Sequence, residues 1–112
     1  MWDRVQLVRA TVPVPVQLDA HADEMAEQAA AVAVCHPTPY VRRLVLTFGT
    51  VYPAEFAQWV VVGTTDPEWA WREMLNDGTT PGWLMVPWLQ RAGFAFDPSR
   101  CGGVFVVRLE RL

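Results

Sequence analysis

His36 is the side chain of this sequence best suited to proton transfer. An imidazole titrates near neutral pH, so it can accept and donate a proton under physiological conditions. His36 follows a segment with helical periodicity and precedes Pro37, which disfavours helical backbone at the residue before it. We therefore expect His36 at a helix end beside a sheet, as the candidate catalytic acid or base. The alternative is a loop histidine in water.

Arginines supply the candidate groups for binding an anion. All nine basic residues are arginine, and the absence of lysine excludes Schiff-base and P-loop chemistry. Arg9 and Arg43 lie in segments with strand character and, like Arg108, could project from a sheet face. A guanidinium there could bind an anionic ligand or the carboxylates of a partner. Ordinary solvated charges are the alternative.

Tryptophans are the candidate contact residues, and the sequence contains six of them. Residues 66–78, DPEWAWREMLNDG, begin with a capping aspartate and a proline and end with a glycine, which predicts a helix. Helical spacing places Trp71 on its apolar stripe and Trp69 on the opposite side. The helix predicted from Thr80 repeats the order of cap, proline and tryptophan with Trp83. We expect Trp69 and Trp83 to fill the seam between the helices or, with Trp59, to contact a ligand or partner.

The sequence contains no signature of a metal site or an activated nucleophile. Cys35, Cys101, His21 and His36 lack the C-x-x-C and H-x-x-x-H spacings of metal ligands. We predict no metal ion, no cofactor, and free thiols in place of a disulfide. Ser99, the sole serine, lies outside any nucleophile elbow, which argues against a serine triad.

Composition predicts one folded domain over residues 1–112. The hydrophobic fraction is 52%, which excludes a disordered chain. The net charge of −3 gives no bulk attraction to nucleic acid or to an anionic membrane. No apolar run approaches the length of a membrane span, and the first residues lack the apolar block of a signal peptide. We therefore predict a cytoplasmic protein, and the absence of lysine and isoleucine indicates a GC-rich bacterium.

The periodicity of the apolar residues predicts the order of the elements. In chain order these are a strand at 8–18, a helix from Asp19 to His36, strands at 40–51 and 55–64, helices at 66–77 and 80–93, and a strand at 102–112. Residues 52–54 are the predicted turn between the middle strands, although 53–60 also fit a short helix. Pro87 should kink or break the helix at 80–93.

This order resembles the ferredoxin-like βαββαβ arrangement, an α+β fold with helices on one face of an antiparallel sheet. The second face also contains apolar side chains, too many for open water. They are Val5, Leu7, Val41, Val45, Val104 and Val106. We therefore expect a second sheet to cover this face, from a homodimer that forms a dimeric α/β barrel. By fold-level analogy, that group includes small cofactor-poor oxygenases, isomerases and cyclases.

Two functions follow, and the sequence does not decide between an enzyme and an interaction protein. The first is a small-molecule-binding domain that acts on an apolar or aromatic substrate in a tryptophan-lined cleft, as a cofactor-free isomerase, cyclase or oxygenase. It predicts an enclosed pocket with a histidine or arginine on its wall. The second is a non-catalytic inhibitor, immunity protein or accessory subunit that uses exposed Trp69 and Trp83 as anchors, without a pocket.

Overall fold

A five-stranded mixed sheet with the strand order β1-β4-β5-β3-β2 organises the chain. The computed structural model describes residues 1–10, 12, 14–47, 54–76 and 80–111. The strands are β1 (Gln17–Leu18), β2 (Tyr40–Thr47), β3 (Ala54–Val62), β4 (Leu89–Asp97) and β5 (Val104–Arg111). Strand β1 runs parallel to β4, and the other neighbouring pairs are antiparallel.

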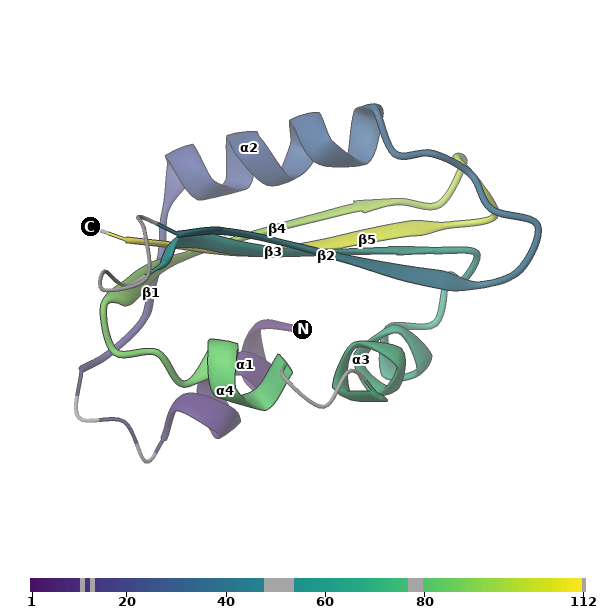
Figure 1. The fold of residues 1–112 in the computed structure, drawn as a ribbon. Helices are drawn as coiled ribbons and strands as arrows, with labels where there is room; N and C mark the ends of the chain where they lie inside the picture. Colours follow the sequence, from purple (N-terminus) through teal and green to yellow (C-terminus); the bar gives the residue numbers. More distant parts are fainter. Residues whose placement is uncertain (11, 13, 48–53, 77–79, 112) are drawn as a thin grey trace.

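Helices pack on both faces of this sheet. They are α1 (Trp2–Arg9), α2 (Ala20–Ala31), α3 (Pro67–Asn76) and α4 (Thr80–Leu84). Helix α2 lies against one face, and α1, α3 and α4 lie against the other (Figure 1). In the part of the chain described, no helix is both long and apolar enough to cross a bilayer.

The two faces of the sheet bury separate apolar clusters. The larger one, the main core, lies on the side of α1, α3 and α4, and its buried members include Trp59, Val61, Met74, Val107 and Leu109. The smaller one lies beneath α2 and includes Ala26, Ala30, Val62, Val104 and Val106. Alternate residues of β3 and β5 thus face opposite layers, as strand geometry requires.

The α+β class is confirmed, but the prediction of helices on one face is wrong. The strand order is also not clearly that of a ferredoxin-like chain. Val41 and Val45 pack against the main core, whereas Val104 and Val106 lie in the cluster beneath α2. Five of the six residues interpreted as one uncovered face are therefore packed within the chain itself, whereas Leu7, on α1, is exposed. The homodimer remains a prediction, but the continuous apolar face on which it was based does not exist in the structure.

The first predicted strand, 8–18, is also wrong. Residues up to Arg9 form α1, and strand structure is limited to β1. Val5 and Arg9, one helical turn apart, are both buried, and Val8 packs against the main core. Arg9 is buried, but an arginine counts as polar when apolar periodicity is read from a sequence, so the buried stripe of α1 could not be recognised. The alternating valines that follow it therefore led to the prediction of a strand.

The predictions for the middle of the chain are largely confirmed. Strands β2, β3 and β5 lie within the predicted ranges or within one residue of them. The described part of 53–60, from Ala54 onward, is strand and not the alternative helix. Helix α3 is confirmed, with Ala70, Trp71 and Met74 buried. Residues 52 and 53 of the predicted turn and the predicted C-terminal Gly78 lie outside the described residues. The helix predicted at 80–93 ends at Leu84. The last part of the predicted range belongs instead to strand β4, which begins at Leu89.

Helix α2 lies unusually close to β4. Asp19 caps the helix, because its Oδ2 accepts a hydrogen bond from the amide of Ala22 at 3.0 Å. Asp23 accepts a hydrogen bond from the amide of Phe94 at 2.9 Å. A Cβ added to Gly93 would lie 2.1 Å from the carbonyl carbon of Ala22, so only glycine permits this approach. The N-terminal end of α2 is thereby held over β4.

Candidate functional site: a pocket between helix α2 and strands β2 and β3

A pocket of about 400 Å³ lies beside helix α2. The helix packs mainly on β4 and β5, so the same face of β3 and β2 extends beyond it. The apolar lining consists of Ala29, Val32, Ala33, Val34, Leu44, Val60 and Val62, and the polar lining of His36, Tyr40, Arg42 and Gln58. The pocket is thus bounded by α2, by the residues that follow it and by two strands.

The floor of the pocket follows from the register of β2 and β3. Tyr40 pairs with Val62, Arg42 with Val60, and Leu44 with Gln58. Alternate residues of a strand point to the same face, so these three pairs form a continuous surface. Both strands and the turn between them were predicted from the sequence, but their register was not. The register places Arg42 and Gln58 on the same side.

The segment after α2 forms one wall and is tied to the turn between β4 and β5. The carbonyl oxygen of Ala33 accepts hydrogen bonds from Nε and Nη2 of Arg100, at 3.2 and 2.9 Å. Cys35 and Cys101 form a disulfide, with their Cα atoms 5.0 Å apart. The prediction of free thiols is therefore wrong. The two cysteines are 66 residues apart in sequence, and only the packing of α2 on β4 and β5 brings them together.

His36 lies on the wall of the pocket. Its ring stacks on Tyr40, with the centroids 4.6 Å apart and 11° between the planes. Its Nδ1 lies 3.5 Å from the hydroxyl oxygen of Thr38. The pocket therefore has a histidine and an arginine, Arg42, on its wall. The small-molecule hypothesis also predicted an enclosed pocket, whereas this one is open to solvent, with both of these side chains exposed. No tryptophan is among its lining residues.

The predicted tryptophan and Arg43 positions lie elsewhere. Trp59 is fully buried in the main core, and its Nε1 donates to the hydroxyl of Thr80 at 3.1 Å. Trp69 and Trp83 are half-buried against the same core. Arg43 pairs with Trp59 in the sheet and so faces the same side. The structure does not bring these residues to the pocket, and their role in binding a partner stays a prediction.

Arg9 uses its two terminal nitrogens within the fold, while its buried Nε has no hydrogen-bond partner among the described residues. Its Nη1 donates to the carbonyl oxygens of Val86 and Leu89 at 2.7 and 2.9 Å, with Leu84 at 3.4 Å, and its Nη2 donates to Val14 at 3.0 Å. Burial lowers the pKa of Arg9, because desolvation disfavours its charged form. These hydrogen bonds join the end of α1 to the connection between α4 and β4.

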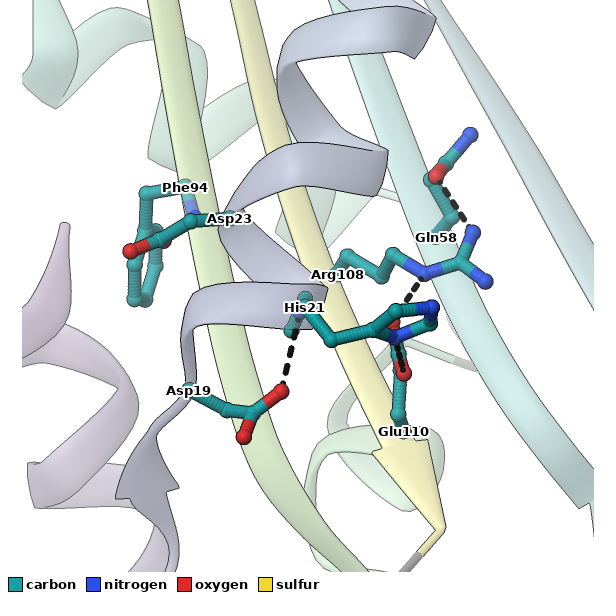
Figure 2. Close-up of polar contacts among 8 residues, drawn as sticks. Asp19, His21, Asp23, Gln58, Phe94, Arg108 and Glu110 are labelled. Carbon is teal, nitrogen blue, oxygen red and sulfur yellow. Dashed lines mark hydrogen bonds and ion pairs between the residues drawn. The ribbon is translucent and has the colours of Figure 1, made fainter.

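A buried polar cluster adjoins the pocket and was not identified from the sequence. Arg108 donates from Nη1 to Oε1 of Gln58 at 2.9 Å and from Nε to Oε1 of Glu110 at 2.8 Å. Oε2 of Glu110 lies 2.9 Å from Nδ1 of His21 (Figure 2). The guanidinium of Arg108 lies 4.0 Å from the ring centroid of Phe56. Charged residues alternating with apolar ones in a last strand normally indicate a solvent-exposed face. Only the structure shows that this face is buried.

Asp19, His21 and Glu110 form the group best placed to hold a metal ion, with ligand atoms within 4.8 Å of one another. Each already has a role, because Asp19 caps α2 while His21 and Glu110 contact each other. A cation would also compete with the guanidinium of Arg108 for the Glu110 carboxylate. We therefore assign these residues to the attachment of α2 to β5.

Comparison with known proteins finds no matching family model, no matching curated protein and no matching solved structure. The functional argument therefore depends on the geometry of the pocket and of the polar cluster beside it.

Proposed function

We propose that this protein binds a small, mainly apolar or aromatic molecule in the pocket between α2 and strands β2 and β3. The observation that supports the proposal is a lining of aliphatic side chains with a few polar groups, around a volume of about 400 Å³. Ligand sites commonly have this composition, and their volumes are about 300 to 1,000 Å³. Each Å² of apolar surface removed from water stabilises the complex by about 25 cal/mol, so a bound ring would gain its affinity here from burial.

The catalytic extension of this proposal assigns proton transfer to His36. Its ring lies on the pocket wall, with Arg42 on the adjacent strand to stabilise negative charge that develops on a substrate. A cofactor-free isomerase, cyclase or oxygenase would need these two roles. Arg42 takes the position that the sequence suggested for Arg9 or Arg43, because the register turns Arg42 toward the pocket.

Indole is a suitable probe of the pocket, because it is small, aromatic and uncharged. We expect indole to shift amide resonances of residues on β2, on β3 and at the end of α2 in a two-dimensional ¹H–¹⁵N NMR titration. The variant Val60→Trp should abolish these shifts by filling the pocket. The matched control is Leu7→Trp, at an exposed site on α1. Shifts confined to α3 and α4, or binding that survives Val60→Trp, would overturn the proposal.

A non-catalytic interaction protein is the second candidate. Val32 and Val34, which line the pocket, are 74% and 76% exposed, and such apolar surface favours a protein partner. This candidate places the partner-binding surface on the α2 side of the sheet. The sequence instead suggested Trp69 and Trp83, which lie on the opposite side of the sheet. A pull-down that loses its partner with Val34→Asp, but keeps it with the Trp69→Ala and Trp83→Ala pair, would place the interaction here.

Homodimer formation and cytoplasmic localisation also stay proposals. Light scattering of the purified protein measures the first. For the second, the Cys35–Cys101 bond is relevant, because disulfides persist mainly in oxidising compartments. The redox state of these cysteines in the intact cell, measured by alkylation, tests the proposal. A reduced pair is expected for a cytoplasmic protein.

A further inference from the structure

We propose that Gln58 selects the polar end of the ligand, and that the preferred ligand is a small carboxylic acid with an apolar or aromatic body. The inference rests on the proposed function, because it assigns the polar chemistry of the same pocket. Its basis is a side-chain amide whose orientation is set by the buried polar cluster.

The orientation of the Gln58 amide follows from the chemistry of arginine. A guanidinium can only donate hydrogen bonds, so the atom of Gln58 that lies 2.9 Å from Nη1 of Arg108 must be the carbonyl oxygen Oε1. The amide nitrogen Nε2, with its two hydrogens, is then turned away from Arg108 (Figure 2). Within the described part of the chain, no acceptor for Nε2 is found. Since Gln58 lines the pocket, Nε2 is the polar atom that it offers there.

Arg108 is held firmly enough to keep this orientation. Its Nε donates to Glu110 at 2.8 Å, and its guanidinium stacks on Phe56. Glu110 is held in turn by His21 at 2.9 Å. Arg108 and Glu110 are 7% and 6% exposed, so separating them would leave a buried charge without its partner. The donor in the pocket is therefore preorganised, which lowers the entropy lost when a ligand binds.

Arg42 places a positive charge beside this donor. It pairs with Val60, which lies two residues from Gln58 on the same face of β3. Among the described residues that line the pocket, none is acidic. A carboxylate could therefore accept hydrogen bonds from both Arg42 and Gln58, whereas a cationic ligand would be repelled. The aliphatic lining that remains is suited to the body of the acid.

Benzoate and benzyl alcohol are matched probes, because both contain a phenyl ring but only benzoate carries a negative charge. In isothermal titration of the wild-type protein, we expect benzoate to bind at least about tenfold more tightly than benzyl alcohol. The variant Gln58→Glu keeps an acceptor for Arg108 but presents a carboxylate to the pocket. It should lower benzoate affinity at least about tenfold and change benzyl alcohol affinity less than about twofold.

A second measurement uses the wild-type protein alone and does not depend on the folding of a variant. The side-chain amide resonance of Gln58 should shift further on saturation with benzoate than with benzyl alcohol, because a carboxylate is the stronger hydrogen-bond acceptor. Equal affinity for both probes, with equal shifts of the Gln58 amide, would overturn the carboxylate inference and leave the proposed pocket intact. Failure of indole, benzoate and benzyl alcohol alike to perturb the pocket would overturn both proposals.

Discussion

Two buried arginines show how the surroundings decide what an arginine does. Arg9 directs its donors to backbone carbonyl oxygens and so joins segments of the chain. Arg108 directs its donors to the side chains of Glu110 and Gln58, and one of these lines a pocket. The same guanidinium group therefore serves backbone packing at one site and orients the side-chain amide of Gln58 at the other.

Thr80 is the acceptor for the indole nitrogen of Trp59, and both residues are fully buried. Thr80→Val keeps the shape of the side chain but removes the acceptor. We expect the free energy of unfolding to fall by about 2 kcal/mol, because a buried donor without a partner costs about 1–3 kcal/mol. Urea denaturation followed by tryptophan fluorescence measures this change. Thr80→Ser keeps the hydroxyl and should lose less than Thr80→Val; a larger loss would contradict this assignment.

The contact between α2 and β4 depends on small residues on both sides. Ala22 and Ala26 are fully buried, and Gly93 lies beneath the first turn of the helix. Because side chains this small let the two backbones approach closely, α2 can dock over β4 and leave β2 and β3 beyond it. The position of the pocket is thus a consequence of where the helix can pack.

Gly93→Ala tests this close approach. The added methyl group would meet the backbone of Ala22, so we expect a loss of about 2 kcal/mol or more in the free energy of unfolding. Gly82→Ala is the matched control, because nothing lies within 4 Å of its added Cβ and the site is in α4. That change should be neutral or stabilise the protein by up to about 1 kcal/mol. Equal effects of the two variants on thermal unfolding would contradict this explanation.

The irregular pairing of β4 explains why its sequence was interpreted as helix. Its register shifts between Leu89 and Arg91, and Leu89 and Ala92 are both buried. Two buried residues three positions apart match helical spacing, although a shift in strand pairing produced them here. Strand β3 carried a similar ambiguity, because residues 53–60 also fitted a short helix, and there the β-branched residues favoured strand. Periodicity alone therefore separates helix from strand poorly over short segments, and it also missed α1.

The disulfide connects the wall of the pocket to the far end of the sheet. Cys35 lies between two pocket residues, Val34 and His36, and Cys101 lies in the turn between β4 and β5. Helix α2 is thus held over the sheet near its C-terminal end by the disulfide and at its N-terminal end by contacts with β4. The pocket lies between these constraints and the strands β2 and β3.

Replacing both Cys35 and Cys101 by serine should destabilise the protein. Because the two are 66 positions apart in sequence, loop-closure entropy predicts a loss of about 4 kcal/mol in the free energy of unfolding. Denaturant titrations of the wild type and the double variant, each with and without a reducing agent, measure it. The reducing agent should destabilise the wild type and leave the double variant unchanged. A double variant as stable as the oxidised wild type would contradict a stabilising role for this bond.

The sequence alone determined several of the regular segments, but it misassigned α1 and β4 and extended the helix before His36 beyond its observed end at Ala31. Apolar periodicity and capping residues act locally, so α2, α3, β2, β3 and β5 could be predicted from them. Burial and proximity involve segments far apart in the chain. Only the tertiary structure could therefore show the disulfide, the helices on both faces of the sheet, and the contact of Gln58 with Arg108, 50 residues away. A charged residue in a strand has the same local pattern whether water or a helix covers it, and packing decides between the two.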